Sequence, residues 1–315
     1  MKGVALGGAV TALMRAGYSF RRVAGTSAGA IVAALVAAGI SEPALTAAME
    51  RLKYPRVADR GFPKLPVVSE GISLLVHGGA YKGDYIHEFV REELERLGVV
   101  TFADLRRTDR GADPALAPYQ RYKLVVMATD VTNGRLLRLP WDYGLLGLEP
   151  DEQRVADAVR ASIAIPLYFE PVVVRDPQSG AETTLVDGGV LSNFPIEIFD
   201  RTDANPRRWP TIGIKLMPGL PAGDQQLFPG HVLPRLAPVK LLESVVATAI
   251  VGNDQTYLQR PCVRWRTIQL DTHSVGIVEF DAPQEKRDTL VANGRAAVEA
   301  FLATWDWERF KRECP

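Results

Sequence analysis

The sequence contains only two cysteines, Cys262 and Cys314, among its 315 residues. Two cysteines are too few for a disulfide framework, and their spacing is not that of a zinc site. Such sparse use of cysteine is typical of a reducing compartment, so we expect a cytoplasmic protein. The sequence also lacks a cluster of metal ligands, a Walker motif and a dinucleotide-binding fingerprint. It therefore predicts neither a bound metal nor a cofactor.

The chain has no excess of charge of either sign and no long apolar run. Lysine and arginine together number 37, as do aspartate and glutamate. This balance does not provide the basic surface of a nucleic-acid-binding protein, so we expect no nucleic-acid partner. The longest candidate for a membrane span, residues 28–40, is shorter than the roughly 20 residues that a bilayer requires. Residues 3–14 are apolar but contain three glycines, which favours a helix with a small-residue face over a signal peptide.

Strands and helices are expected to alternate along the chain, which is 47% hydrophobic. The expected helices cover residues 3–16, 28–38, 41–52, 84–97, 155–165, 239–258 and 283–305. The expected strands cover residues 20–24, 123–129, 135–139, 168–174, 183–186, 211–216 and 263–270. This alternation predicts an α/β layered fold with a mostly parallel sheet.

No repeat, low-complexity tract or linker divides the sequence. We therefore expect one domain over residues 1–315, in which residues 218–315 pack against the part that carries the motifs described below, residues 1–217.

Residues 25–29 have the sequence Gly-Thr-Ser-Ala-Gly, which fits the pattern Gly-x-Ser-x-Gly. An expected strand precedes it and an expected helix follows, and this is the context in which the pattern presents a nucleophilic serine. Gly25 and Gly29 lack the Cβ atoms that would hinder a sharp turn and a close approach of the helix. Ser27 would then lie at a helix amino terminus, which favours developing negative charge. An ordinary Gly-Ser turn that caps a helix has the same letters, so the pattern alone does not decide.

Ser27 also needs a base, and two arrangements are open. In a Ser-Asp-His triad the histidine would be His231 or His273, although both lie in loop-like sequence. In a Ser-Asp dyad the base would be Asp187, which ends an expected strand and precedes two glycines at 188–189. Partial burial would raise the basicity of its carboxylate. Taken alone, the Asp-Gly-Gly sequence is more typical of an ordinary turn.

Four segments in this order resemble those of the patatin-like phospholipase family. They are residues 25–29 (Gly-Thr-Ser-Ala-Gly), 128–135 (Ala-Thr-Asp followed by Gly-Arg), 160–171 (Arg-Ala-Ser-Ile-Ala-Ile-Pro, then Phe-Glu-Pro) and 187–195 (Asp-Gly-Gly-Val-Leu-Ser-Asn-Phe-Pro). Ordered segments are far more specific than one motif. The resemblance covers roughly the first two-thirds of the chain and ends near residue 219.

This resemblance implies a three-layer α/β/α fold of the patatin type and a Ser-Asp dyad without a catalytic histidine. Ser27 would be the nucleophile that forms an acyl-enzyme, and Asp187 would be the base, with Gly188 and Gly189 supporting its turn. The implied activity is that of a lipid-degrading hydrolase without a cofactor. Its implied substrates are membrane phospholipids or other acyl esters, so peripheral contact with a membrane is expected.

The resemblance also implies an oxyanion hole, formed in the family by a glycine-rich loop after the first strand. In this sequence only Lys2 and Gly3 match the end of that loop, and Gly25, Ala28 and Gly29 of the nucleophile segment complete the expected site. The first strand and the leading glycines of the family pattern have no counterpart. The nucleophile strand is therefore expected to have an open edge.

Two explanations of this departure remain open. The natural protein begins upstream of Met1, or the chain is a degenerate member that no longer catalyses efficiently. The intact segments around Ser27 and Asp187 favour the first explanation.

Two further functions also remain open, namely a lipid- or protein-binding module that keeps the fold and a Ser-His-Asp esterase that acts on soluble esters. A separate expectation concerns residues 62–81, whose apolar side chains suit either a lid that contacts membrane or core packing beneath a loop. The high content of alanine and arginine suggests a bacterial source.

Overall fold

A computed structural model describes residues 2–59, 78–107, 116–201, 207–217, 237–252, 255–273, 275–276, 279–280 and 282–314. His231 and all but the last four residues of the candidate lid at 62–81 lie outside the described residues. Within the described part of the chain, no helix combines the length and the apolar character that crossing a bilayer requires.

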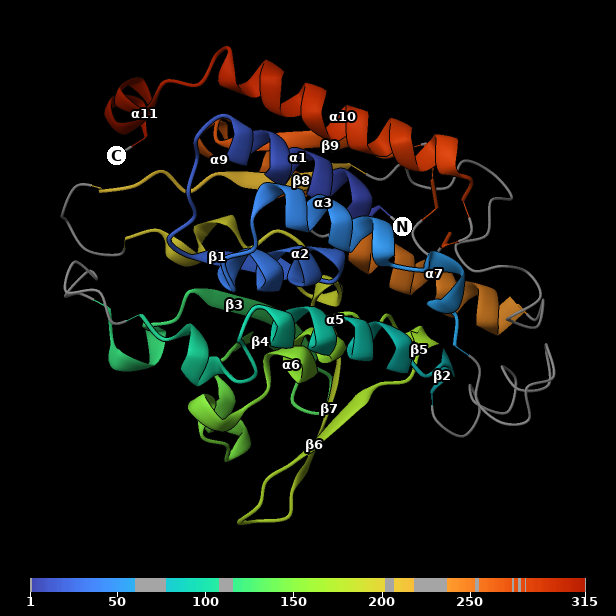
Figure 1. The fold of residues 1–315 in the computed structure, drawn as a ribbon. Coiled ribbons are helices and arrows are strands. Elements are labelled where there is room, and N and C mark those ends of the chain that lie inside the picture. Colours follow the sequence, from blue (N-terminus) through green and yellow to red (C-terminus); the bar gives the residue numbers. More distant parts are fainter. Residues whose placement is uncertain are drawn as a thin grey trace.

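The order of elements follows the predicted alternation (Figure 1). The helices are α1 (Gly3–Arg15), α2 (Ala28–Ala37), α3 (Glu42–Arg51), α5 (Asp84–Arg96), α6 (Val155–Ser162), α7 (Ala237–Gly252), α8 (Gln255–Leu258), α9 (Pro261–Arg264), α10 (Gln284–Leu302) and α11 (Trp307–Glu313). The strands are β1 (Val23–Thr26), β2 (Gly79–Tyr81), β3 (Leu124–Asp130), β4 (Arg135–Leu139), β5 (Leu167–Phe169), β6 (Val172–Arg175), β7 (Glu182–Asp187), β8 (Gly213–Met217) and β9 (Thr267–Asp271).

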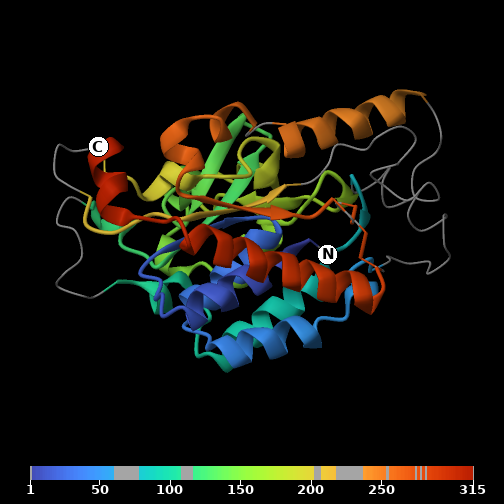
Figure 2. The ribbon, with the colours of Figure 1, turned by 90° about the horizontal axis from the view of Figure 1, so that it is seen from above.

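The strands form one five-stranded sheet and two small sheets. The large sheet has the order β1-β3-β7-β6, with β4 paired to β3, and the small sheets are β2-β5 and β8-β9. The β1–β3, β2–β5 and β8–β9 pairs are parallel, whereas β4, β7 and β6 pair antiparallel with their neighbours. Helices α1 and α10 cover one side of the strands and α7 lies on the other (Figure 2). This confirms the three-layer α/β/α class.

Strand β3 is the centre of the large sheet, and all seven of its residues are buried. This burial explains why its sequence is continuously apolar up to Thr129. The chain then reverses at Gly134, which has a φ of 66°. The Asp130 carboxylate accepts hydrogen bonds from the Asn133 N–H at 2.9 Å and from Arg135 Nε at 2.8 Å. The Asp, Asn-Gly and Arg of the predicted hairpin thus stabilise its turn.

Several predicted elements differ from the structure; the strand expected at residues 20–24, for example, is β1 at Val23–Thr26. Three other differences have a clear physical cause. Residues 168–174 form two strands in different sheets. Pairing is interrupted between them because Pro171 has no N–H to donate and because the Glu170 carbonyl accepts a hydrogen bond from Arg160 Nη2 at 2.8 Å. The helix expected to reach residue 165 ends at Ser162, before the restrictive Pro166. The strand expected from residue 263 begins later, because Pro261 starts the short helix α9.

The last third of the chain packs against the first. Helix α10 contacts α1 along its length, and apolar residues of β9 and α10 belong to the same core as those of α1 and β3. This continuous core supports the single domain expected from the sequence. The contact is close because both helices have glycine at the crossing: a Cβ on Gly294 would lie 2.3 Å from the Ala5 carbonyl oxygen, and one on Gly8 would lie 2.5 Å from that of Val291. The predicted small-residue face of the first helix is therefore confirmed.

The two cysteines form a disulfide, which the sequence analysis did not expect. Cys262 follows the start of α9 and Cys314 follows α11, and their Cα atoms lie 5.6 Å apart although 52 positions separate them. Ring contacts between Trp265 and Phe310 accompany this contact. Only the tertiary packing of the carboxyl-terminal helix brings the two thiols together.

Among the described strands, β1 pairs only with β3 and β8 pairs only with β9. The nucleophile strand therefore has the open edge that the sequence leads us to expect.

The close crossing of α1 and α10 makes a specific prediction for Gly294. In Gly294→Val the new side chain must displace the α1 backbone, so we expect a loss of about 2 to 3 kcal/mol in the free energy of unfolding. Ala296→Val places the same side chain at an exposed position of the same helix and should change little. Urea unfolding of both variants tests this, and equal midpoints would contradict the tight contact.

Candidate active site

Ser27 lies between β1 and α2 in a backbone conformation that ordinary residues rarely adopt. Its φ is 54° and its ψ is −129°. Such strain persists only where the surroundings fix it, and it occurs mainly at functional sites. The strand–turn–helix context predicted for Ser27 is therefore confirmed, and the turn is completed at this one residue.

The two glycines of the motif are not equivalent. A Cβ on Gly25 would lie 2.3 Å from the Gly29 carbonyl oxygen and 2.7 Å from the Cα of Ala30, so only glycine fits there. A Cβ on Gly29 would meet only Leu6 Cδ1, at 3.9 Å, which is an ordinary contact. The expectation that both glycines relieve crowding is correct for Gly25 alone, because β1 runs directly beneath the first turn of α2.

The register of the sheet brings Ser27 and Asp187 to the same level on opposite sides of β3. Thr26 is opposite Met127 on one side, and Asp187 is opposite Ala128 on the other. Two strand spacings separate the two residues by about 9 to 10 Å at Cα. Serine and aspartate side chains that extend across β3 can bridge this separation.

The Asp187 carboxylate is 1% exposed. Its Oδ1 accepts a hydrogen bond from the Gly189 N–H at 2.7 Å. Within the described residues, Oδ2 has no hydrogen bond of standard geometry. The Ser27 hydroxyl acts to lower the pKa of this carboxyl group. Catalytic hydrogen bonds are often long before substrate binds.

Burial dominates the acidity of Asp187. Desolvation raises its pKa to about 7, against the opposing effects of hydrogen bonds from Ser27 and Gly189. A carboxylate with this pKa is a far stronger base than one in water, and it is still largely ionised slightly above neutral pH.

The two glycines after Asp187 let its turn approach the sheet. A Cβ on Gly188 would lie 2.5 Å from the Met127 carbonyl oxygen, so a larger residue does not fit. Gly189 supplies the N–H that holds Asp187 Oδ1. Both residues thus lie where the sequence predicted support for the base.

Two helix amino termini meet beside Ser27. Helix α1 begins at Gly3 and α2 begins at Ala28, and a Cβ on Gly3 would lie 3.1 Å from the Ala28 Cβ. The first N–H groups of a helix have no partner within it, and they favour negative charge. Lys2, just before α1, is almost fully buried, and this burial lowers its pKa to about 8 against the attraction of Glu279 and Asp271. The structure therefore brings together the residues predicted for an oxyanion hole.

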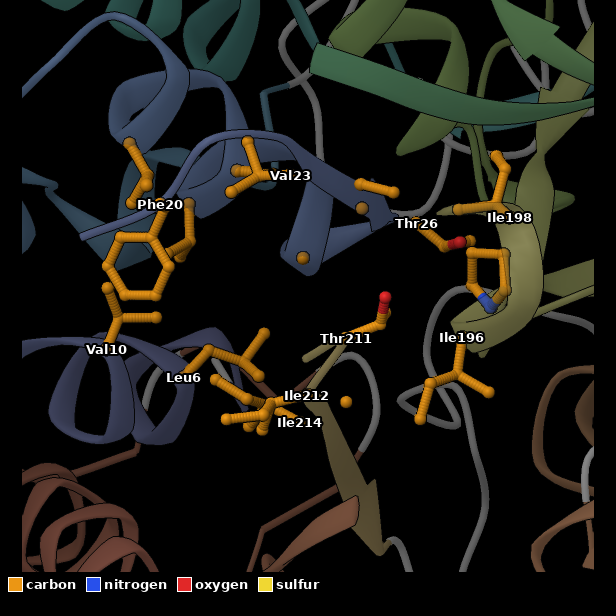
Figure 3. A pocket seen from close by; sticks show the side chains of 18 of the residues that line it. Leu6, Val10, Phe20, Val23, Thr26, Ile196, Ile198, Thr211, Ile212 and Ile214 are labelled. Carbon is orange, nitrogen blue, oxygen red and sulfur yellow. The ribbon is translucent and has the colours of Figure 1, made fainter. Parts of the chain in front are cut away.

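A cavity of about 760 Å³ extends from Ser27 between β1 and β8 (Figure 3). Its walls are mostly apolar side chains from α1, β1, β8 and the segment after Asp187, among them Leu6, Val10, Val23, Ile196, Ile212 and Ile214. The Thr26 hydroxyl donates to the Ser192 carbonyl at 3.3 Å and joins β1 to that segment.

The structure does not bring a described histidine to Ser27. No histidine is among the described residues that line the cavity. His273 binds the neighbouring Asp271 at 2.7 Å and is exposed, and His87 binds Asp157 at 2.7 Å. His231, the other candidate for a triad, lies outside the described residues. The described chain also contains no group of three or more side chains suited to hold a metal ion.

The sequence analysis missed two residues that contact Ser27 and Asp187 through backbone groups. The Ser27 N–H donates to Ser162 Oγ at 3.0 Å, and the Asp187 N–H donates to the Ala164 carbonyl oxygen at 2.9 Å. Ser162 and Ala164 are fully buried. Both belong to the segment 160–171 noted in the sequence, but only the fold shows what they contact.

The chain is similar to proteins of one family. A model of the patatin-like phospholipase family matches residues 1–200. The uncharacterized protein YqhO of Bacillus subtilis (strain 168) is 32% identical over 308 residues, which cover 98% of this chain and 96% of YqhO.

Two solved structures are also similar to this chain. VipD from Legionella pneumophila has a TM-score of 0.52 at 19% identity, and the match covers 96% of this chain but 65% of VipD. The type III effector protein ExoU has a TM-score of 0.47 at 16% identity, with 96% of this chain and 51% of ExoU covered. This chain thus spans less than two-thirds of either structure. The similarity to VipD indicates a shared fold.

The raised pKa of Asp187 predicts how stability depends on pH. A carboxyl group whose pKa is about 7 in the folded state and 3.8 when unperturbed favours folding fully only below pH 3.8, and this contribution is lost as the pH rises through 7. Above that pH, burial of the charge costs about 4 kcal/mol. We therefore expect Asp187→Asn to stabilise the fold at pH 8, with a gain that shrinks toward pH 5.

Urea unfolding at pH 5, 6, 7 and 8 tests this expectation. Asp176→Asn is the control, because hydrogen bonds from Ser179 and Gln178 lower the pKa of that exposed carboxyl group. A pH dependence of Asp187→Asn that is identical to that of the parent would rule out a buried, proton-binding Asp187.

Proposed function

The chain belongs to the patatin-like phospholipase family, and we propose that it is a serine hydrolase of lipid acyl esters in which Ser27 is the nucleophile and Asp187 the base. The observation that carries this proposal is the placement of Ser27, at a strained turn, level with the buried carboxyl group of Asp187, whose pKa is about 7. A base of this strength can take the hydroxyl proton near neutral pH without a histidine.

In the proposed reaction, ionised Asp187 accepts the Ser27 hydroxyl proton while Oγ attacks the ester carbonyl carbon. The carbonyl oxygen becomes an oxyanion as the new C–O bond forms. Asp187 then returns the proton to the departing alcohol as the original ester bond breaks, which leaves an acyl-enzyme. Water attacks this intermediate in the same way, with Asp187 accepting its proton and returning it to Ser27, and the fatty acid is released.

The amino termini of α1 and α2 are the proposed site of the oxyanion. Gly3 and Ala28 begin these helices beside Ser27, with Lys2, Gly25 and Gly29 around them. The N–H of Ser27 itself is not available, because it already donates to Ser162. Each oxyanion donor in a serine hydrolase contributes roughly 10²- to 10³-fold to turnover.

The cavity beside Ser27 supports an ester with a hydrocarbon chain. Its volume, about 760 Å³, and its largely apolar walls suit a ligand of lipid size. A phospholipid or another acyl ester is therefore the proposed substrate, which such an enzyme would reach by peripheral contact with a lipid surface.

Nucleophile and base are tested by covalent labelling and ester hydrolysis. A fluorophosphonate probe should label the protein at Ser27, and Ser27→Ala should abolish both labelling and hydrolysis of a p-nitrophenyl ester. We expect Asp187→Asn to lower kcat/KM by about 10³-fold or more, because the base is lost. His273→Ala should leave both activities unchanged.

Two outcomes would contradict the dyad. Activity that survives Asp187→Asn but is lost in His231→Ala or His273→Ala would indicate a triad instead. Absence of labelling, together with lipid binding that survives Ser27→Ala, would indicate a binding protein.

The pH profile of kcat/KM provides a separate test. Only ionised Asp187 can accept the proton, and its pKa is about 7, so kcat/KM should fall about tenfold per pH unit below that value. A rate that is constant between pH 5 and 8 would mean that the base titrates near the ordinary value for aspartate and is not the buried Asp187.

A further inference from the structure

One short stretch of chain, residues 162–164, contacts the backbones of both Ser27 and Asp187. Ser162 Oγ accepts the Ser27 N–H at 3.0 Å, and the Ala164 carbonyl accepts the Asp187 N–H at 2.9 Å. The stretch and its two partners come from different elements: Ser162 ends α6, Ser27 follows β1 and Asp187 ends β7. The two contacts therefore connect the two sides of the site through a stretch of three residues.

The Ser162 hydroxyl holds the strained part of the site. Ser27 has a positive φ, a conformation that relaxes unless its neighbours fix it. Its N–H donates to the hydroxyl of Ser162, a residue that is 0% exposed. Loss of that acceptor would leave a desolvated N–H without a partner, which favours a shift of the Ser27 backbone.

The Ala164 carbonyl lies just beyond the end of α6 and binds Asp187. The helix stops at Ser162, so the carbonyl of Ala164 has no intrahelical partner. It accepts the Asp187 N–H at the residue where β7 passes into the Gly188 turn. The hydrogen bond thus fixes the point from which the Asp187 side chain extends.

Helix α6 packs against several elements, so residues 162–164 at its end can hold both Ser27 and Asp187 in place. Its buried face packs against β3, β7 and α2. On its other side, the Arg160 guanidinium donates to the Lys82 and Glu170 carbonyls. A shift of Ser162 would therefore require movement of several packed elements.

We propose that Ser162 is a positioning residue for the nucleophile, and that residues 162–164 fix Ser27 and Asp187 relative to each other. Among the described residues, the Ser162 hydroxyl bonds the backbone N–H of Ser27, so it acts through Ser27 and not on the reacting atoms. The kinetic part of this inference rests on the proposed function, whereas its structural part does not.

Kinetics of Ser162→Ala test the positioning role. A displacement of Oγ by about 1 Å costs on the order of 10²-fold in rate, so we expect kcat and the fluorophosphonate labelling rate to fall by 10- to 100-fold while KM stays nearly unchanged. Ser162→Thr keeps the hydroxyl and should retain most of the rate. Thr11→Val is the control, because it removes a buried hydroxyl bond, to the Gly8 carbonyl, within α1.

The pH profile separates positioning from loss of stability. The Ser27 hydroxyl lowers the pKa of Asp187, so a displaced Ser27 should let that pKa rise. The acid limb of kcat/KM in Ser162→Ala should therefore move to higher pH, whereas a merely destabilised enzyme such as Thr11→Val should keep the parental limb. A normal kcat with a parental limb in folded Ser162→Ala would overturn the proposal.

Amide hydrogen exchange tests the structural part without any activity. The Ser27 N–H should exchange slowly in the parent and in Ser162→Thr, and at least tenfold faster in Ser162→Ala, with no such change in Thr11→Val. Unchanged protection in Ser162→Ala would overturn the role of Ser162. If the parent neither hydrolyses esters nor reacts with the probe, the proposed function fails, and this measurement still decides whether Ser162 holds Ser27.

Discussion

The structure depends on the turn by which β1 becomes α2 at Ser27. A strand can lead into a helix this sharply only if one residue accepts a positive φ and the crossing backbones come very close. Gly25 makes the close approach possible, and Ser162 accepts the N–H that the turn leaves without a backbone partner. The same turn directs the start of α2 toward the start of α1. The strained backbone of Ser27 and the meeting of the two helix amino termini therefore have the same geometric cause, which is the sharp turn from β1 into α2.

The properties of Asp187, the proposed base, follow from a second constraint, which is that this residue ends a strand inside the protein. Its carboxyl group is buried, and in the described part of the chain the Gly189 N–H and the Ser27 hydroxyl oppose the effect of this burial on its pKa. The resulting pKa of about 7 disfavours folding in alkaline solution and at the same time provides a base at neutral pH. Stability and proposed chemistry thus oppose each other at this residue, as is common at functional sites.

The last third of the chain, which has no recognisable motif, completes the site. Helix α10 packs on α1 through facing glycines and so holds the amino end of α1 beside Ser27. Strand β8, which is paired with β9, forms the far wall of the cavity whose near wall is β1. The disulfide between Cys262 and Cys314 ties the final helix to this region.

The sequence by itself determined the layered class, most helices and strands, and the two residues Ser27 and Asp187. These features depend on local patterns: apolar periodicity, glycines at a sharp turn and ordered motifs. Tertiary structure alone decided which backbone groups meet. It divided residues 168–174 between two sheets, ended α6 at Ser162, paired cysteines 52 positions apart, and placed Ser162 and Ala164 against the dyad. Contacts of this kind depend on register and packing between distant segments, and no local pattern encodes them. The acidity of Asp187 belongs with them, because desolvation is a property of the assembled core.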